Sequence, residues 1–321
     1  MNVKALSVFR NRNYSIYFSG QLISLSGAWI QNVAESWLVY RMTHSAVRLG
    51  VIGFSYKLPA FLISPIAGVV ADRINRRKVL MVVLVCVFIQ SSVLAALVFT
   101  GKIQVWHLVV LAVVLGILNA FDMTIRHSFA VDMVGKEHLG SAIAANSAVL
   151  NLSRMLGPAA AGFLIASVGE AWCFALNGMS TIPVLIALFF MKVPRHKDSG
   201  ERQNAFRQIR DAAKYVFRHE LIFPLLMLST FVCLFAAPYY VLLPVFAKTV
   251  LHGGPNTMGW LSCALGLGAV VGVGTVGGTN RHILSSIVVW GVALCMLAYS
   301  SSVWLSLLSI FLIGHSMMGF F

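Results

Sequence analysis

The sequence predicts an all-α membrane protein that crosses the bilayer many times. Hydrophobic residues make up 59% of its 321 residues and charged residues only 11%, whereas about a quarter of an average soluble domain is charged. Apolar runs of about 20 residues, the length that a helix needs to cross the hydrocarbon core, recur along the chain. Because backbone groups in lipid must be satisfied within the segment, we expect these runs to be helices rather than barrel strands.

Charges and Gly/Pro clusters divide the apolar sequence into ten predicted spans. They lie at 15–40, 47–70, 78–100, 104–125, 139–167, 171–192, 221–247, 256–278, 283–299 and 302–321. The long polar stretch after the sixth span has its apolar residues on one helical face and its basic residues around the other, from 205 to 218. This pattern predicts an amphipathic helix that lies on the membrane surface.

The formal charge of +14 follows the expected membrane topology. With the N-terminus placed inside, 18 of the 24 Lys and Arg residues fall in cytoplasmic segments, four fall in outer segments, and Lys57 and Arg154 lie within spans. Cytoplasmic loops carry such an excess of positive charge in multi-pass proteins. We therefore expect a protein of the plasma (inner) membrane, with a cytoplasmic N-terminus, in contact with the lipid bilayer and without a nucleic-acid partner.

No pattern in the sequence predicts an enzyme. The five cysteines are scattered singly and the nine histidines form no H-E-x-x-H or similar set, so neither a disulfide framework nor a metal site is expected. The Gly-rich run from Gly266 lacks the strand and the Gly-Lys-Ser/Thr of a nucleotide-binding loop, and helix packing explains it better. We expect no cofactor.

The loop between the second and third spans carries the most specific motif. Gly68, Asp72, Arg73, Arg76 and Arg77 follow the pattern G-x-x-x-D-R-x-x-R-R, with one further cation after them. This pattern is similar to the signature loop of major facilitator transporters. The resemblance implies a fold of two six-helix bundles that move by alternating access.

Applied to this chain, that fold predicts an N-terminal six-helix bundle at 1–193, a cytoplasmic linker at 194–220, and a second bundle at 221–321 with about four helices. Ten spans are two fewer than the fold requires. Because the sequence stops at Phe321 within an apolar run, we expect a chain that is truncated at its C-terminus, and a ten-helix variant of the fold is the alternative.

Three further segments resemble one branch of this superfamily, which includes enterobactin exporters and macrolide efflux proteins. They lie at 119–129, 151–158 and 243–255. The resemblance implies export of small, often amphipathic molecules, usually in exchange for protons. Gly157, Pro158 and Gly162 are similar to the antiporter motif G-P-x-x-G-G, with Ala161 in place of one glycine. Small residues let helices approach closely, and the proline frees a backbone carbonyl.

Ionisable residues within spans are costly and therefore suggest function. We expect Lys57 and Arg154, near the midplane, to line a substrate cavity and attract anions. Glu35 is the candidate for proton exchange, with Gln31 and Asn32 as polar neighbours on the same helix. The alternatives are that Glu35 pairs with Arg41 or Arg48 near the interface, and that Gln31 and Asn32 only form hydrogen bonds between helices.

The charged motif has a mechanical role by resemblance. In the family, the carboxylate equivalent to Asp72 interacts with a helix N-terminus of the other half and closes the cytoplasmic side. Gly68, Arg73, Arg76 and Arg77 belong to the same loop. Asp122 and Arg126, at the cytoplasmic end of the fourth span, lie at a depth where they would pair with this loop. We expect these residues to form a gating network.

The function predicted is proton-coupled efflux of a small amphipathic compound such as a drug, macrolide or siderophore. A lipid or lysophospholipid transporter is an alternative, in which Lys57 and Arg154 would hold a phosphate. A second alternative is a truncated remnant that transports nothing. The sequence does not predict an oligomeric state.

Overall fold

The computed structural model describes residues 12–134, 139–191, 210, 214–219, 222–235, 238–275 and 280–320. Its elements are helices throughout these ranges, which confirms the predicted all-α class. Of the predicted surface helix, 214–218 are helical, with Tyr215 and Phe217 exposed. Its other residues, Arg210 apart, lie outside the described part of the chain.

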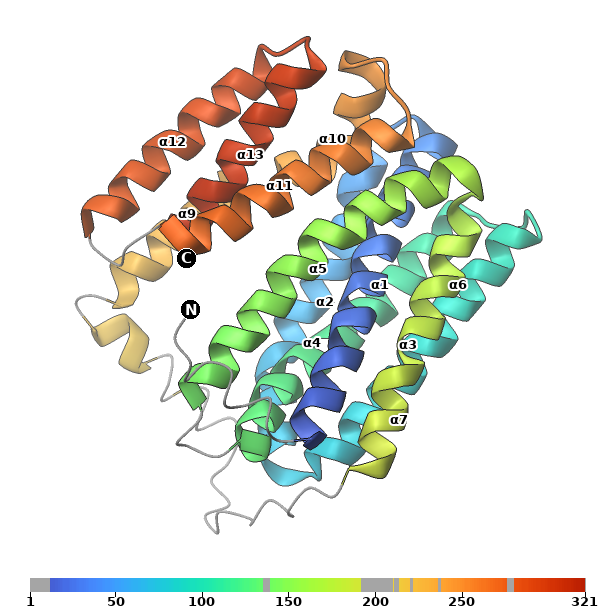
Figure 1. The fold of residues 1–321 in the computed structure, drawn as a ribbon, viewed down its shortest axis with the longest axis vertical. Coiled ribbons are helices and arrows are strands. Elements are labelled where there is room, and N and C mark those ends of the chain that lie inside the picture. Colours follow the sequence, from blue (N-terminus) through green and yellow to red (C-terminus); the bar gives the residue numbers. More distant parts are fainter. Residues whose placement is uncertain are drawn as a thin grey trace.

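The helices form two groups (Figure 1). The first group, coloured blue to yellow-green, contains α1 (Arg12–Thr43), α2 (Ala46–Arg73), α3 (Arg76–Phe99), α4 (Val105–Val134), α5 (Leu139–Ser167), α6 (Glu170–Ser180) and α7 (Ile182–Phe190). The second group, coloured yellow-orange to red, contains α9 (Ile222–Phe235), α10 (Tyr239–Val245), the π-helix η3 (Phe246–Val250), α11 (Pro255–Thr275), α12 (Asn280–Ala298) and α13 (Val303–Phe320).

Every predicted span is occupied by helix. Within the described residues, six helical segments are long and apolar enough to cross a membrane: Ala46–Val70, Arg76–Phe99, Val105–Arg126, Ile143–Ser167, Glu170–Phe190 and Pro255–Val273. Shorter apolar helices occupy Ile222–Val232, Tyr239–Val250, Leu284–Ala298 and Val303–Gly319. The first predicted span lies within α1, which has 32 residues.

Two spans that the sequence predicts as single helices are interrupted. The sixth is divided at Thr181 into α6 and α7, and Pro183 follows in the first turn of α7. The seventh is divided before α10, where Pro238 is the N-terminal cap, and it continues as a π-helix after Pro244. Proline cannot donate the hydrogen bond that continues a helix, so each interruption lies next to a residue that weakens the ladder.

Short capped connections join the long helices. The Ser45 side chain accepts a hydrogen bond from the backbone N–H of Arg48 (3.4 Å) and begins α2, and Asn75 accepts from the N–H of Lys78 (3.3 Å) and begins α3. Such side chains satisfy N–H groups that have no partner within the helix. The end of the helix bundle at Ser45 is called the Ser45 face below, and the opposite end is called the Asn75 face.

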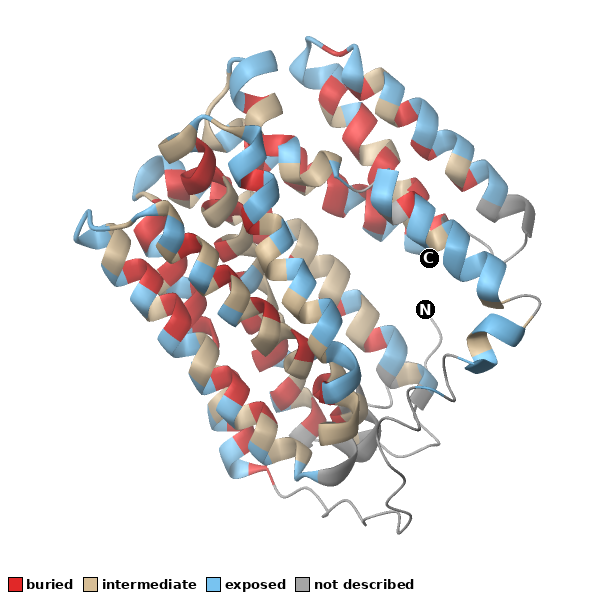
Figure 2. Cartoon of the chain, turned by 180° about the vertical axis from the view of Figure 1, so that it is seen from behind, coloured by how far each residue is buried: buried red, intermediate tan, exposed pale blue. Residues whose placement is uncertain are grey.

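Helix α1 lies inside the first group and packs against α5, α6 and α7, while α2 packs against α4 and α3 packs against α4 and α6. Buried residues follow the interior of this group and exposed residues cover its outer surface (Figure 2). In the second group, α13 packs against both α11 and α12.

The main contact between the groups is made by α5 and α11. A Cβ atom added to Gly162 would lie 2.8 Å from the Cα of Gly259, and one added to Gly259 would lie 2.8 Å from the Cα of Gly162. The two backbones therefore touch at this point. Further along, Gly266 of α11 lies against the backbone of Arg154 and Met155. Part of the Gly-rich run thus serves helix packing, as its sequence suggested.

Candidate functional site

Four side chains form a connected set between the two groups of helices. The Cζ atom of Arg154, on α5, lies 5.3 Å from the ring centroid of Trp29, on α1. The Trp29 ring meets that of Tyr240, on α10, edge to face at a centroid distance of 6.3 Å and an angle of 87°. The Tyr240 hydroxyl donates a hydrogen bond to Oδ1 of Asn32, on α1 (3.1 Å). We call Trp29, Asn32, Arg154 and Tyr240 the bridging cluster.

Small residues and prolines position this cluster. A Cβ atom on Gly157 would lie 2.5 Å from Cβ of Trp29, so the antiporter-like motif brings α5 directly against the helix segment that carries the indole. Pro158 follows, and without an N–H it leaves the carbonyl of Arg154 free of the usual helical bond. On α10, Pro244 has the same effect on the carbonyl of Tyr240, and the π-helix begins two residues later.

Glu35 lies on α1 one turn beyond Asn32 and is half-buried. Among the described residues no cation or hydrogen-bond donor pairs with its carboxylate. The Tyr56 hydroxyl, on α2, interacts electrostatically with both Glu35 and Asp122. At Gly116, the backbone of α4 approaches the backbone of Tyr56 closely, because a Cβ on this glycine would overlap the carbonyl of Tyr56.

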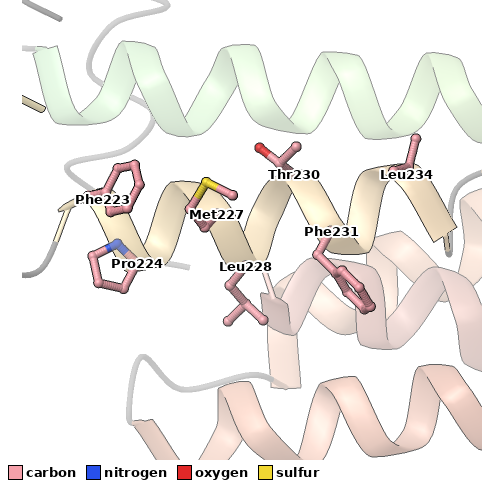
Figure 3. Close-up of a pocket in the computed structure, with 7 residues that line it drawn as sticks. All are labelled: Phe223, Pro224, Met227, Leu228, Thr230, Phe231 and Leu234. Atoms are coloured by element: carbon pink, nitrogen blue, oxygen red, sulfur yellow. The ribbon is translucent and has the colours of Figure 1, made fainter. Parts of the chain in front are cut away.

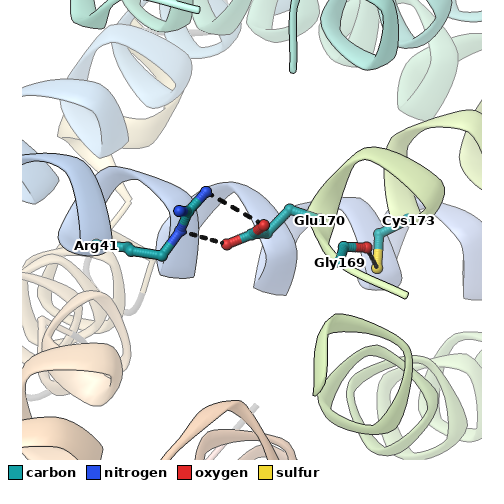
Figure 4. A network of polar contacts seen from close by, with 4 residues as sticks. All are labelled: Arg41, Gly169, Glu170 and Cys173. Carbon is teal, nitrogen blue, oxygen red and sulfur yellow. Dashed lines mark hydrogen bonds and ion pairs between the residues drawn. The ribbon is translucent and has the colours of Figure 1, made fainter. Parts of the chain in front are cut away.

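The ion pair suggested between Glu35 and Arg41 is not formed. Arg41 instead contacts Glu170 at the start of α6, with Nε donating to Oε1 (2.8 Å) and Nη2 to Oε2 (3.3 Å), as Figure 4 shows. Arg41 lies in the last turn of α1 and Glu170 in the first turn of α6. Each charge therefore also faces the favourable end of its own helix dipole. The pair fastens α1 to α6 at the Ser45 face.

Neither Lys57 nor Gln31 belongs to the bridging cluster. Lys57 is exposed on α2, with Nζ 5.4 Å from the ring centroid of Tyr56. Gln31 is buried between helices, where its Oε1 accepts from Ser91 (2.8 Å) and Asn177 (2.8 Å). Its Nε2 donates to Gln90 (3.2 Å). The hydrogen-bonding alternative therefore describes the Gln31 side chain in this structure.

The predicted gating residues lie at the Asn75 face. Arg126 donates to both carboxylate oxygens of Asp122 on its own helix, at 2.8 and 2.9 Å. The buried Tyr17 hydroxyl and Arg126 Nη1 interact electrostatically without full hydrogen-bond geometry. Arg76 donates to the carbonyl of Ser128 (3.4 Å), which ties the start of α3 to α4.

Arg77 donates to the carbonyl of Phe189 (2.7 Å), near the last turn of α7. The backbone of Asp72 and Arg73 forms the end of α2, and their side chains lie outside the described part. Gly68 has open space beside it, since a Cβ atom there would meet nothing within 4 Å. The structure therefore shows which helix ends Arg76 and Arg77 hold, and it leaves the role of Gly68 and Asp72 as a prediction.

An apolar groove follows α9, away from these residues. It is lined by Phe223, Pro224, Met227, Leu228, Thr230, Phe231 and Leu234 (Figure 3). Its one polar side chain, Thr230, already donates to the carbonyl of Leu226 (2.8 Å). The groove offers no charged group for recognition. Within the described residues, no group of three or more His, Cys, Asp or Glu side chains is arranged to hold a metal.

Sequence reasoning found Arg154, Asn32 and Glu35 but missed Trp29, Tyr240 and Tyr56. These aromatic residues look like ordinary apolar positions in a membrane span. The only available signals were the i, i+3 spacing of Trp29 and Asn32 and the position of Pro244 four residues after Tyr240. Neither signal indicates which helices meet.

Comparison with known proteins identifies transporters. The Staphyloferrin A transporter of Staphylococcus aureus is 26% identical over 290 residues, which cover 87% of this chain and 72% of the relative. Macrolide efflux protein A of Streptococcus pyogenes is 22% identical over 289 residues, covering 88% and 71%. A mutant of nucleoside transporter NupG has the same fold, with a TM-score of 0.70 at 14% identity over 95% of this chain and 79% of that structure.

The solved structure establishes the all-helical major facilitator fold, and the relatives include an efflux protein and a siderophore transporter. The predicted superfamily, the predicted fold and the expectation that the chain is not an enzyme are thereby confirmed. The family model described as "Transmembrane secretion effector" matches residues 3–320, so the chain belongs to this family of multi-pass major facilitator transporters.

Proposed function

We propose that the chain is a proton-coupled efflux transporter for a small amphipathic compound, in which Glu35 is the proton-exchanging group. In this proposal the Asn75 face is cytoplasmic, because 18 of the 24 Lys and Arg residues fall on that side. Residues 1–193 and 221–321 act as two bundles joined by 194–220, and they alternate access to the site between them.

The observation that carries the proposal is the state of the Glu35 carboxylate. It lies in a membrane helix one turn from the bridging cluster, and none of the described residues pairs with it. A carboxylate without a fixed cation can bind and release a proton without first breaking an ion pair. Glu170, in contrast, is held by Nε and Nη2 of Arg41.

The contacts of the bridging cluster support coupling between substrate and conformation. Trp29, Asn32 and Arg154 belong to the first group of helices and Tyr240 belongs to the second. A substrate bound here would touch both groups, so its affinity would differ between arrangements of the bundles. The Asp122–Arg126 pair and Arg76 would take part in closing the cytoplasmic side.

The test uses inverted membrane vesicles with an acidic interior and an acridine dye that reports the proton gradient. Ethidium, erythromycin and 1-naphthylacetate are added in turn to vesicles that contain the chain. We expect at least one compound to release protons from wild-type vesicles, and Glu35→Gln to abolish this release. Glu170→Gln is the matched control, since it removes a carboxylate of the same helix bundle that is already paired.

Two results contradict the proposal. Equal proton release by the wild type and by Glu35→Gln would remove Glu35 from the coupling step. Failure of all three compounds to release protons from wild-type vesicles, with the protein present and folded, would refute proton-coupled efflux of this class of compound.

A further inference from the structure

Arg154 is a membrane-embedded cation whose compensation in the structure is incomplete. Among the described residues no carboxylate forms an ion pair with it and no acceptor takes a hydrogen bond from it. The Trp29 ring lies 5.3 Å from its Cζ atom, and the Tyr240 ring meets that of Trp29 edge to face. A guanidinium in a span is costly unless something partners it.

The contact with Trp29 covers the guanidinium but does not use its N–H groups. A cation over an indole ring is attracted by the negative face of the ring. The five N–H donors of arginine lie in the guanidinium plane, where they form a rigid fork. Arg154 is half-buried. Several side-chain N and O atoms of the protein are fully enclosed and have no hydrogen-bond partner, but no nitrogen of Arg154 is one of them. Its donors therefore remain accessible.

We propose that Arg154, Trp29 and Tyr240 form a recognition subsite for an amphipathic substrate that carries a carboxylate next to a flat apolar group. The fork would bind the two carboxylate oxygens, which match its spacing. The aromatic rings would pack against the apolar part. This inference rests on the proposed function, because it names the substrate class of the same site.

A monovalent carboxylate fits this subsite better than a phosphate. Arg154 is the single cation of the bridging cluster, and Lys57 lies exposed beside Tyr56 on α2 rather than in the cluster. A planar carboxylate also matches the guanidinium plane, whereas a tetrahedral phosphate matches it only in part.

The subsite lies where the two groups of helices meet. Gly266 of α11 packs against the backbone of Arg154 and Met155, so the guanidinium emerges from α5 where the two groups of helices meet. Trp29 packs against α5 at Gly157. The ring of Tyr240, on α10, contacts the ring of Trp29. A carboxylate bound to Arg154 would therefore lie at the contact that must rearrange when the bundles move.

The test measures binding without a proton gradient. The full chain in nanodiscs of phosphatidylcholine is titrated calorimetrically with 1-naphthylacetate and with the neutral 1-naphthylacetamide. We expect the carboxylate to bind about tenfold more tightly, the difference that one charge-assisted contact provides. Arg154→Gln should remove this preference, so that the two probes bind with similar affinity, and Arg154→Lys, which keeps the charge but not the fork, should retain only part of it.

Arg48→Gln is the matched control, because it removes an exposed arginine outside the cluster. A size-exclusion profile and a melting temperature that match those of the wild type show that Arg154→Gln is folded. Equal affinity for the two probes in the wild type, a preference that survives in Arg154→Gln, or no binding of either probe would overturn the proposal.

A second titration replaces part of the phosphatidylcholine with phosphatidylglycerol. If the anionic lipid displaces 1-naphthylacetate from the wild type at low mole fraction, the subsite takes a lipid headgroup and the small-molecule proposal fails. If the carboxylate remains bound, the lipid source is excluded. These measurements need no transport, so binding that depends on Arg154 without proton release would refute the proposed function and leave this inference intact.

Discussion

Replacing Gly162 by alanine adds a methyl group where α5 and α11 cross. The new Cβ would lie 2.8 Å from the Cα of Gly259 and 3.0 Å from the carbonyl oxygen of Pro255. The first distance is about 0.6 Å short of the 3.4 Å at which ordinary contact begins. Both neighbours are backbone atoms, which cannot turn aside as a flexible side chain does. The helices must separate, and the contact along α5 and α11 loosens.

Overpacking of this kind costs about 1–3 kcal/mol, and the gain from replacing glycine by alanine within a helix offsets up to about 1 kcal/mol. We therefore expect a net loss of about 1–2 kcal/mol and a lower melting temperature of the purified protein, followed by size-exclusion chromatography after heating. Gly140→Ala, on the same helix, is the control, because its Cβ would meet nothing within 4 Å. If Gly162→Ala is as stable as Gly140→Ala, the inferred backbone contact is wrong.

Three other substitutions test separate contacts. Gln31→Leu removes three buried hydrogen-bond contacts and should lower the free energy of unfolding by about 2 kcal/mol in a denaturation experiment; a neutral effect would show that the network is not formed. Glu170→Gln should cost about 1 kcal/mol, since the Arg41 side chain is 55% exposed whereas that of Glu170 is only 10% exposed, and high salt should reduce the difference in melting temperature from the wild type; an unchanged melting temperature at low salt would argue against the ion pair. Tyr240→Phe removes the bond to Asn32 and should cost about 1 kcal/mol while changing the rate of proton release; unchanged stability and transport would argue against a bond between the groups.

The positions of the spans were accessible from the sequence because they depend on local composition. A helix in lipid satisfies its own backbone hydrogen bonds, so an apolar run of sufficient length predicts a helix whatever surrounds it. The predicted spans match the observed helices to within a few residues, except in α4, which extends to Val134, about nine residues beyond the predicted end. The interruptions at Thr181 and before α10 were missed because transmembrane helices tolerate proline where neighbouring groups satisfy the freed backbone.

The site was only partly predictable. Arg154 and Glu35 were identified because charged residues are rare within spans, since charge in lipid is costly wherever it occurs. The same reasoning did not reveal that Arg41 pairs with Glu170, 129 residues away, rather than with Glu35. It also gave no reason to choose Trp29 and Tyr240 among the many aromatic residues of the chain.

By itself, the sequence determined the helical class, the boundaries of most spans and the family, because the motif residues and the length of each apolar run are local properties. Only the tertiary structure decided that Gln31 joins a buried network and that Arg154 meets Trp29 and Tyr240. These outcomes depend on which helix faces pack together, and that choice is made by contacts such as Gly162 with Gly259, where two backbones touch because neither residue has a side chain to keep them apart.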